Sequence, residues 1–452
     1  MNKFSAVILA AGAGSRMKSS KPKVLQEISG KPLIKWVIDA ISPLNPDKIV
    51  IVVGHKAELV ESALAGIANI SFAHQKEQLG SANALESARD LFIDYGGDIV
   101  VLSGDVPLIK TQTLKSLLDQ HEKDSNSITV LGAKVANPFG YGRIVQNNNE
   151  IIKIVEQKDA SPDEQKIDEI NSGIYCFDKN IWTALSKVKP NNAKNEYYIT
   201  DTLAILKDMG LRAGLFTISD DKQILGVNDM AQLAQMEAIA QNEKIQELFN
   251  SGVKIIDPKN VYISWDAKIG QDTIIYPQVF VSSNVSIGKN CQLMGSCFIK
   301  NSKIADDVII KYSYVDGAQI ERGVQIGPFS HLRPQTVLGE NVKVGNFSEV
   351  KKSVINENSK VNHLSYIGDA EIGKNVNIGA GTITCNYDGS KKHKTIIGDN
   401  SFIGSNVNFV APIKIHEDVL IAAGSTITAD VKAGDLAIAR SRQRAIARKI
   451  SK

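Results

Sequence analysis

The 452-residue sequence contains only four cysteines, and no two of them have C-x-x-C spacing. This scarcity argues against a disulfide framework or a cysteine-based metal site as the basis of the fold. One cysteine, Cys291, falls on a six-residue repeat that it shares with Thr273, Val279 and Val285. We therefore interpret all four as reduced thiols with a structural role: Cys176, Cys291, Cys297 and Cys385.

Long apolar segments and an excess of one charge are also absent. The formal net charge is +3, which favours neither a nucleic-acid-binding surface nor an acidic solvating chain. The N-terminal sequence MNKFSAVILAAG has an apolar run too short for a cleavable signal peptide, and no later segment is apolar enough to span a bilayer. We expect a cytoplasmic protein with neither a nucleic-acid nor a membrane partner. The chain is too long to fold around one compact core, and its length predicts two or three domains.

The C-terminal half repeats with a period of six residues. Apolar residues recur at every sixth position in two runs: Ile269, Ile275, Val281, Ile287 and Leu293, then Ile397, Ile403, Phe409, Ile415, Ile421 and Ile427. Glycine follows several of them: Gly270, Gly288, Gly398 and Gly404. A helix has a period near 3.6 and a strand a period of 2, so neither explains the pattern. It predicts a parallel β-helix, in which short strands form the faces of stacked coils.

A group of polar side chains lies inside this repeat region. His363 is followed within a few coils by Tyr366, Asn377, Asn386 and Tyr387. A single surface histidine usually has only a solvated role, and turn residues of a β-helix are commonly polar. Because coils stack closely, these five side chains can converge, and they form a candidate site.

The N-terminal half begins with a predicted buried strand, residues 4–11 (FSAVILAA), that runs directly into the loop 12–17 (GAGSRM). Such a loop is either an ordinary turn or a phosphate-binding loop, since exposed backbone N–H groups suit anionic oxygens. The dinucleotide fingerprint is incomplete because Met17 replaces its third glycine, and the Walker A pattern is absent. Arg16 and Lys23 supply two cations, which suit a triphosphate better than a dinucleotide.

Strands and helices alternate after this loop. Residues 48–53 and 98–102 are typical of buried parallel strands, with predicted helices at 33–41 and 81–92. Ligands of such α/β sheets bind at the carboxyl ends of the strands. Asp105 follows a strand there; it is either a turn residue or, opposite a phosphate loop, a ligand for Mg²⁺.

Two sequence signatures add a family resemblance to these patterns. LAAGAGSRM followed by KPKVL resembles the signature of sugar-1-phosphate nucleotidyltransferases, which usually has Thr where Ser15 stands. Together with the hexapeptide half, residues 4–440 resemble the bacterial family of bifunctional N-acetylglucosamine-1-phosphate uridyltransferases and glucosamine-1-phosphate acetyltransferases. The resemblance implies a Rossmann-like α/β nucleotidyltransferase domain followed by a left-handed parallel β-helix.

The same resemblance implies two reactions. Acetyl passes from acetyl-CoA to glucosamine-1-phosphate, and a uridylyl group then passes from UTP to N-acetylglucosamine-1-phosphate with release of pyrophosphate. It also implies Mg²⁺ as cofactor and a homotrimer that shares sites between subunits.

For uridylyl transfer the resemblance assigns two catalytic cations near the phosphates, Arg16 and Lys23, and two metal ligands, Asp105 and Asn228. The remaining substrate-binding positions are Leu9, Ala10, Ala11, Gly12, Gln75, Gly80, Ser81, Ser103, Gly104, Gly140, Glu156 and Asn171. Two of them depart from the family's pattern, since Ser81 replaces a usual Thr and Ser103 a usual Tyr.

For acetyl transfer the resemblance assigns His363 as the base. The implied sugar-phosphate contacts are Arg333, Lys351, Tyr366 and Asn377, and the implied acetyl-CoA contacts are Ala380, Asn386, Tyr387, Ser405, Ala423 and Arg440. A histidine suits the base because its pKa lies near neutrality. The basic sequence beyond Arg440 is interpreted as a solvated end without an assigned function.

The expected domains are a nucleotidyltransferase domain at 1–228, a linker helix at 229–252 and a hexapeptide-repeat acetyltransferase domain with a basic tail at 253–452. Two alternatives stay open on the residues alone. One is a uridylyltransferase whose β-helix only assembles or regulates it, and the other is a non-catalytic assembly subunit.

Overall fold

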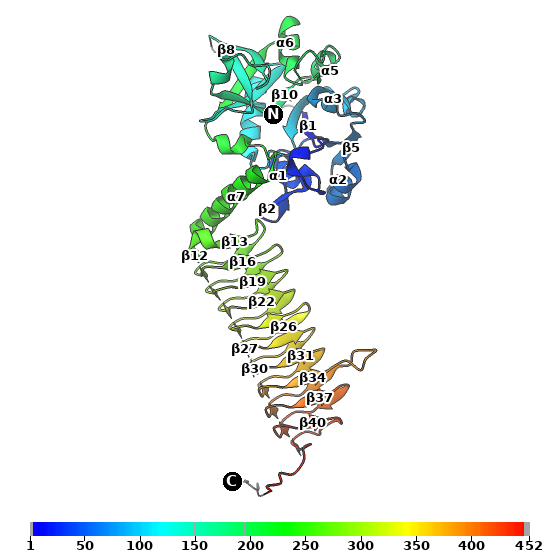
Figure 1. Ribbon diagram of the computed structural model, residues 1–452, viewed down its shortest axis with the longest axis vertical. Helices are drawn as coiled ribbons and strands as arrows, with labels where there is room; N and C mark the ends of the chain where they lie inside the picture. Colours follow the sequence, from blue (N-terminus) through cyan, green and yellow to red (C-terminus); the bar gives the residue numbers. More distant parts are fainter. Residues whose placement is uncertain (1–2, 149, 194, 447–452) are drawn as a thin grey trace, which may run out of the picture. The chain divides into compact units, whose positions relative to one another are not determined.

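The computed structural model describes residues 3–148, 150–193 and 195–446, and the chain divides into two compact units, Met1–Ala240 and Gln241–Lys452. Figure 1 shows the α/β unit in blue to green and the repeat unit in green to red. None of the helices in the described ranges is long and apolar enough to cross a membrane.

The first unit is built on a mixed sheet, with nine strands in the described residues and the main order β11-β7-β10-β6-β1-β4-β5. β1 is parallel to both β4 and β6, whereas β10 is antiparallel to β6 and β7. The hairpin of β8 and β9 joins the sheet through β10. The strands are β1 Phe4–Leu9, β4 Ile49–Val53, β5 Ile70–His74, β6 Asp98–Ser103, β7 Ile128–Lys134, β8 Gly142–Asn147, β9 Glu150–Val155, β10 Glu169–Phe177 and β11 Ala213–Ile218, with a separate pair β2 Glu27–Ile28 and β3 Lys31–Pro32.

Helices cover both faces of this sheet. Successive side chains of a strand point to opposite faces, and since both sets are apolar here, both faces must be covered. Ala6 and Ile8 of β1 face α1, α2 and α4, whereas Val7 faces α3, α5 and α6. The helices are α1 Leu33–Ile41, α2 Ala57–Leu64, α3 Ser81–Glu86, α4 Thr111–Lys123, α5 Ile181–Leu185 and α6 Asp201–Asp208. Short 3₁₀ helices are Ser15–Met17, Lys23–Leu25, Ser42–Leu44, Arg89–Phe92, Glu164–Lys166, Asp221–Ile224 and, in the second unit, Pro258–Asn260. The predicted α/β fold class is confirmed.

The helix α7 (Met230–Asn250) is continuous across the boundary between the units. Met236 and Ala240 belong to an apolar cluster of the first unit, and Ile245 and Leu248 belong to the core of the second. The expected linker helix therefore contributes side chains to the core of each unit.

The second unit is a left-handed parallel β-helix, so the six-residue period is correctly interpreted. Its described strands form three parallel sheets of 11, 10 and 9 strands, which we call face 1, face 2 and face 3. Each strand pairs with the equivalent strand of the next coil, for example β27 with β30. The predicted apolar positions point inward: Ile275 and Leu293 are buried one coil apart in face 1.

The strand bounds follow the order of the coils on each face. Face 1 comprises β12 Lys254–Ile255, β15 Ile274–Ile275, β18 Gln292–Met294, β21 Ile309–Lys311, β24 Gln325–Ile326, β27 Lys343–Asn346, β30 Lys360–His363, β33 Asn377–Ile378, β36 Phe402–Ile403, β39 Leu420–Ile421 and β41 Leu436–Ala437. Face 2 comprises β13 Val261–Ile263, β16 Val279–Val281, β19 Phe298–Lys300, β22 Tyr314–Asp316, β25 His331–Leu332, β28 Glu349–Lys351, β31 Tyr366–Gly368, β34 Ile383–Cys385, β37 Asn408–Val410 and β40 Thr426–Ile427. Face 3 comprises β14 Lys268–Ile269, β17 Ser286–Ile287, β20 Lys303–Ile304, β23 Ala318–Ile320, β26 Thr336–Leu338, β29 Val354–Ile355, β32 Ala370–Ile372, β35 Thr395–Ile397 and β38 Ile413–Ile415.

One loop leaves the regular coil between β34 and β35 (Figure 1). Its two arms are joined by an antiparallel bridge between Tyr387 and Lys392. Asp388 accepts hydrogen bonds from Ser390 N and Lys391 N, which lowers the pKa of its carboxyl group, as does its bond to the ring of His393. The loop is thus held in one conformation by its own polar contacts.

Candidate active sites

A cavity of ≈ 350 Å³ opens at the carboxyl ends of β1 and β6, where the sequence places its phosphate loop. Most of the predicted uridylyl-transfer residues line it: Leu9, Ala10, Ala11, Gly12, Lys23, Gln75, Gly80, Ser81, Ser103 and Asp105. The sequence did not point to Gln78 and Glu196, which also line the cavity. Gln78 donates from Nε2 to Ala11 O at 2.8 Å and so fixes the loop after β1.

Local packing explains the loop sequence. Met17 stands where a dinucleotide fingerprint has glycine, and here its side chain is buried in a cluster with Leu33 and Val227. This anchor holds the 3₁₀ turn that carries Arg16. Gly14 has φ 61°, and a Cβ on it would lie 2.9 Å from Lys23 Cβ. The second glycine therefore lets the loop approach the lysine closely.

Four side chains form a charged cluster that begins at the cavity wall, which Lys23 and Asp105 line, and continues outside it with Arg16 and Asn228. The Lys23 ammonium contacts Asp105 Oδ2, and its Nζ lies 3.5 Å from Asn228 Oδ1. Arg16 Nη2 donates to the same Asn228 oxygen at 2.8 Å. Val227 N donates to Asp105 O at 2.9 Å, which ties the segment before Asn228 to the end of β6. The side chains of Lys23 and Asp105 are 17% and 15% exposed, so their contact is weakly screened by solvent.

The donor set suits a hard divalent cation. One carboxylate oxygen of Asp105 and the amide oxygen of Asn228 face the same ammonium group, which shows that both can surround one positive charge. Within the described residues no cluster of three or more His, Cys, Asp or Glu side chains could hold a metal alone. Proteins commonly bind Mg²⁺ with one or two carboxylates, and substrate phosphates then supply further ligands of the ion.

Three predicted substrate-binding residues lie near the β8–β9 hairpin: Gly140, Glu156 and Asn171. Gly142 of β8 pairs with Asn171 of β10. A Cβ on Gly142 would lie 3.3 Å from Glu156 Oε1 and 3.5 Å from Asn171 Cβ, so these two side chains approach one point. Asn171 Nδ2 donates to Tyr175 OH at 2.7 Å. Gly140, whose N–H donates to Gln157 Oε1 at 2.9 Å, lies at the entrance to this hairpin.

Gly80 and Ser81 are fixed against the segment before α6. Gly80 has φ 120°, and a Cβ there would lie 2.5 Å from Tyr197 O. Ser81 Oγ accepts a hydrogen bond from Ile199 N at 3.0 Å. Gln75 Nε2 donates to Asn83 Oδ1 at 2.8 Å, which orients its side chain at the cavity wall.

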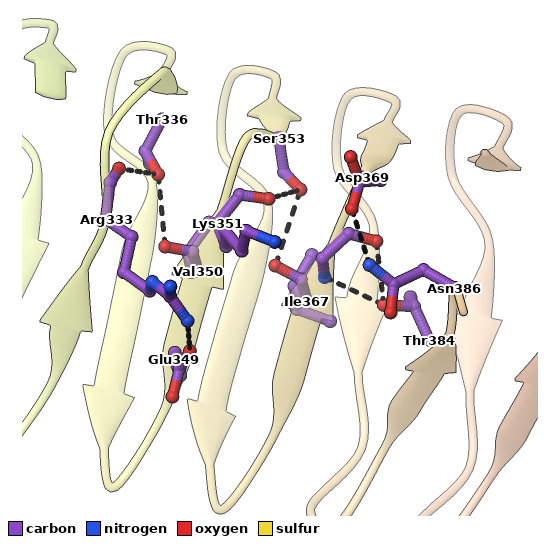
Figure 2. A network of polar contacts seen from close by, with 11 residues as sticks. Arg333, Thr336, Glu349, Val350, Lys351, Ser353, Ile367, Asp369, Thr384 and Asn386 are labelled. Atoms are coloured by element: carbon purple, nitrogen blue, oxygen red, sulfur yellow. Dashed lines mark hydrogen bonds and ion pairs between the residues drawn. The ribbon is translucent and has the colours of Figure 1, made fainter. Parts of the chain in front are cut away.

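In the β-helix, one polar cluster lies at the corner between faces 2 and 3 (Figure 2). Arg333 Nη1 pairs with Glu349 Oε1 at 2.9 Å, and this hydrogen bond raises the pKa of Arg333. Asn386 Nδ2 donates to Asp369 Oδ2 at 2.5 Å. Lys351 lies between these two pairs in Figure 2.

A second lysine belongs to this corner. Contact with the Lys351 side chain lowers the pKa of Lys392, which stands on the protruding loop. Two neighbouring ammonium groups repel each other, and an anion between them would relieve that repulsion. The Asp369 carboxylate acts on Lys392 in the opposite direction and raises its pKa, so part of this repulsion is already offset.

His363 lies at the other edge of face 2, at the corner between faces 1 and 2. Its Nδ1 lies 2.7 Å from Asn346 Oδ1, one coil earlier. An amide oxygen only accepts, so this contact favours a proton on Nδ1, and in the neutral imidazole of that tautomer Nε2 carries the lone pair. Arg440 Nη1 donates to Ala423 O at 2.7 Å at the same corner.

In the described part of one chain the predicted acetyl-transfer residues lie at different places on the β-helix. Ala380, Ser405 and Ala423 follow strands of face 1 and share the corner of His363. Tyr366 is the first residue of β31. A Cβ added to Gly368 would lie 2.4 Å from the Tyr366 hydroxyl, so the side chain of Tyr366 extends along face 2. Asn377 lines a separate cavity of ≈ 380 Å³ with Lys343 and Lys360.

The sequence did not point to Asn346, Glu349, Asp369 or Lys392. Three of them stand 17 residues before a predicted residue, since Asn346 precedes His363, Glu349 precedes Tyr366 and Asp369 precedes Asn386. A coil of this β-helix has about this length, so counting back one coil from each candidate would have found them.

Comparison with known proteins agrees with both halves of the structure. A nucleotidyl transferase family model matches residues 5–222, a GMPPB C-terminal domain model matches 258–323 and 314–407, and a model of the bacterial transferase hexapeptide (six repeats) matches 394–429. Bifunctional protein GlmU of Acetivibrio thermocellus is 45% identical over 98% of this chain and 96% of its own length. The bifunctional protein GlmU of Geotalea uraniireducens is 47% identical, covering 98% of each chain.

The chain belongs to the bifunctional GlmU family. Members of the GlmU family are uridyltransferase and acetyltransferase enzymes, and this chain is one of them. Its two units thus match the two transferase halves of the GlmU family. The alternatives of a purely structural β-helix and of a non-catalytic assembly subunit are not supported.

Proposed function

We propose that each compact unit carries one complete set of reaction chemistry for UDP-N-acetylglucosamine synthesis. The β-helix transfers acetyl from acetyl-CoA to glucosamine-1-phosphate. The α/β unit then transfers a uridylyl group from UTP to the N-acetylglucosamine-1-phosphate so formed, with release of pyrophosphate. We assign the first reaction to residues 253–452, the second to 1–228, and a connecting role to 229–252.

For uridylyl transfer, Arg16 and Lys23 bind the triphosphate and stabilise negative charge as the bond to pyrophosphate breaks. Phosphoryl-type transfer depends on alignment and charge stabilisation more than on a base, and Lys23 lines the cavity while Arg16 is linked to it through Asn228. Lys23 would leave Asp105 for the phosphates when substrate binds. Glu156 and Asn171 hold the sugar hydroxyls, consistent with their convergence beside Gly142.

Asp105 and Asn228 would hold Mg²⁺ in this site. The ion would neutralise phosphate charge and help to orient the triphosphate. Their shared contact with the Lys23 ammonium supports this assignment, because the same two oxygens already surround a positive charge.

For acetyl transfer, His363 accepts the proton of the attacking amine at Nε2. Asn346 supports this role by holding the Nδ1 proton. Arg333 and Lys351 bind the sugar phosphate, and Tyr366 and Asn377 the sugar. Ala380, Asn386, Tyr387, Ser405, Ala423 and Arg440 bind acetyl-CoA.

We propose a homotrimer, working in the cytoplasm, in which neighbouring copies complete each acetyl-transfer site. The division of the predicted residues between the two edges of face 2 supports this assembly. So does a row of exposed apolar side chains beside His363: Tyr312, Phe329, Phe347 and Leu364 are 49–61% exposed. All four have positive φ, which is costly for bulky residues and indicates that the row has a function beyond the turn.

The observation that carries the two-site proposal is the presence of two separate clusters, Lys23–Asp105–Asn228 in one unit and Asn346–His363 in the other. Asp105→Ala should lower pyrophosphate release from UTP by more than about 100-fold, because loss of metal-assisted charge stabilisation costs several kcal/mol. It should leave CoA release from acetyl-CoA at the parental rate.

His363→Ala should do the reverse, lowering acetyl transfer by about 10²–10⁴-fold, the usual contribution of a general base. Both activities are measured on both variants, and thermal unfolding checks that each is folded. Loss of both activities in either folded variant would contradict two independent sites.

A further inference from the structure

Ser103 makes a contact that the two proposed reactions do not yet use. Its Oγ–H donates to Asp105 Oδ1 at 2.6 Å, whereas Asp105 Oδ2 faces Lys23. The carboxylate of the proposed metal ligand is therefore held at both oxygens by different partners. This contact depends on the short serine side chain, which brings its hydroxyl to the carboxylate two residues further on.

The backbone around this contact is already fixed. Ser103 ends β6 in register with Leu9 of β1, and Gly104 N donates to Leu9 O at 2.9 Å. Asp105 O accepts from Val227 N at 2.9 Å. The freedom that remains to Asp105 is rotation of its side chain, and Ser103 and Lys23 restrict that rotation.

The two partners differ in what happens when substrate binds. Lys23 has a long flexible stem, and its ammonium is attracted to a triphosphate more strongly than to one carboxylate. Ser103 has a short side chain and is the last residue of β6, half-buried beside a buried strand interior, so it can move much less than Lys23. Once Lys23 has moved, the serine hydroxyl is the contact that keeps Oδ1 occupied and Oδ2 directed into the cavity.

We infer that Ser103 is a positioning residue that orients Asp105 for binding the divalent cation. This inference rests on the proposed uridylyl-transfer site. It gives Ser103, which also lines the cavity, a second role: the serine favours cation binding through its neighbour Asp105. Groups that orient metal ligands commonly contribute about 10- to 100-fold to metal affinity.

The test measures Mn²⁺ binding directly, by electron paramagnetic resonance of free Mn²⁺ with the full-length protein and saturating UDP-N-acetylglucosamine. Ser103→Ala should raise the Mn²⁺ dissociation constant by roughly 10-fold. Ser103→Thr, which keeps a hydroxyl, should regain most of the affinity. Ser42→Ala removes a hydroxyl that donates to Ile38 O at 2.7 Å away from the cavity, and it should bind Mn²⁺ like the parent.

Asp105→Ala separates failure of this inference from failure of the proposed function. If Asp105→Ala binds Mn²⁺ as tightly as the parent, the proposed metal site itself is wrong. If Asp105→Ala loses Mn²⁺ but Ser103→Ala stays within twofold of the parent, the metal site stands and the role of Ser103 is overturned. A loss in Ser103→Ala that Ser103→Thr does not restore would also overturn it, since packing rather than the hydroxyl would then be responsible.

Discussion

At the scale of single residues, hydrogen bonds one coil apart decide what the candidate groups can do. The imidazole of His363 is exposed, and its contact with Asn346 favours the tautomer that carries its proton on Nδ1. Similarly, Glu349 orients the guanidinium of Arg333. Asp369 orients the side-chain amide of Asn386. Such pairs orient reactive groups on a face that is otherwise open to solvent.

We predict that Asn346→Ala lowers acetyl transfer by roughly 10-fold, because the neutral imidazole would then no longer be held with its Nε2 lone pair toward the amine. CoA release from acetyl-CoA is the measurement. Uridylyl transfer by the same variant is the control and should be unchanged. An acetyl-transfer rate within twofold of the parent would show that Asn346 does not orient His363.

Sequence reasoning from residues alone reached only some of these groups. Asp105 and Lys23 follow a strand and a glycine loop, so their location at a sheet edge is predictable. In the sequence Glu156 looks like a surface charge and Asn171 like a turn residue. They meet only because β9 and β10 both pair with β8. Such a meeting depends on strand pairing between distant segments, which residue patterns do not encode; their family resemblance pointed to both.

At the scale of elements, the β-helix is predictable because its core repeats at a fixed spacing. In the two runs found in the sequence every sixth residue is buried, and glycine follows several of these residues where two coils approach closely. A Cβ on Gly398 would lie 2.5 Å from Glu417 N on the next coil. The exposed row that includes Phe329 and Phe347 was not foreseen, since turns at positive φ usually carry Asn, Asp or Gly.

We predict that Gly398→Ala destabilises the β-helix by about 1–3 kcal/mol, the usual cost of forcing an extra carbon into a packed contact. Thermal unfolding is the measurement. Gly96→Ala is the matched control, because a Cβ on Gly96 would meet nothing within 4 Å. Equal melting temperatures for the two variants would mean that the coils can separate to accept a methyl group.

At the scale of the whole molecule, the division between the two compact units falls within the helix α7 and not between two elements. The sequence predicts a connecting helix after residue 228, and α7 begins at Met230. However, Met236 and Ala240 are 1% and 4% exposed in a cluster with Met17 and Ile28. The first half of the helix thus supports the loop that carries Arg16.

We predict that a fragment of residues 1–240 retains uridylyl transfer and is more stable than a fragment of residues 1–228. The shorter fragment lacks Met236, whose burial is worth about 1.5–3 kcal/mol. Pyrophosphate release and the melting temperature of both fragments are the measurements. A folded but inactive 1–240 fragment would mean that uridylyl transfer requires the β-helix.

The central claim is that the β-helix is itself catalytic and works independently of nucleotide. Its most direct test is CoA thiol release from acetyl-CoA by the full-length protein, with glucosamine-1-phosphate and without UTP. We predict release that requires the amino sugar and is lost in His363→Ala. No sugar-dependent release, from protein that still forms pyrophosphate from UTP and N-acetylglucosamine-1-phosphate, would contradict the claim and leave the β-helix a structural role.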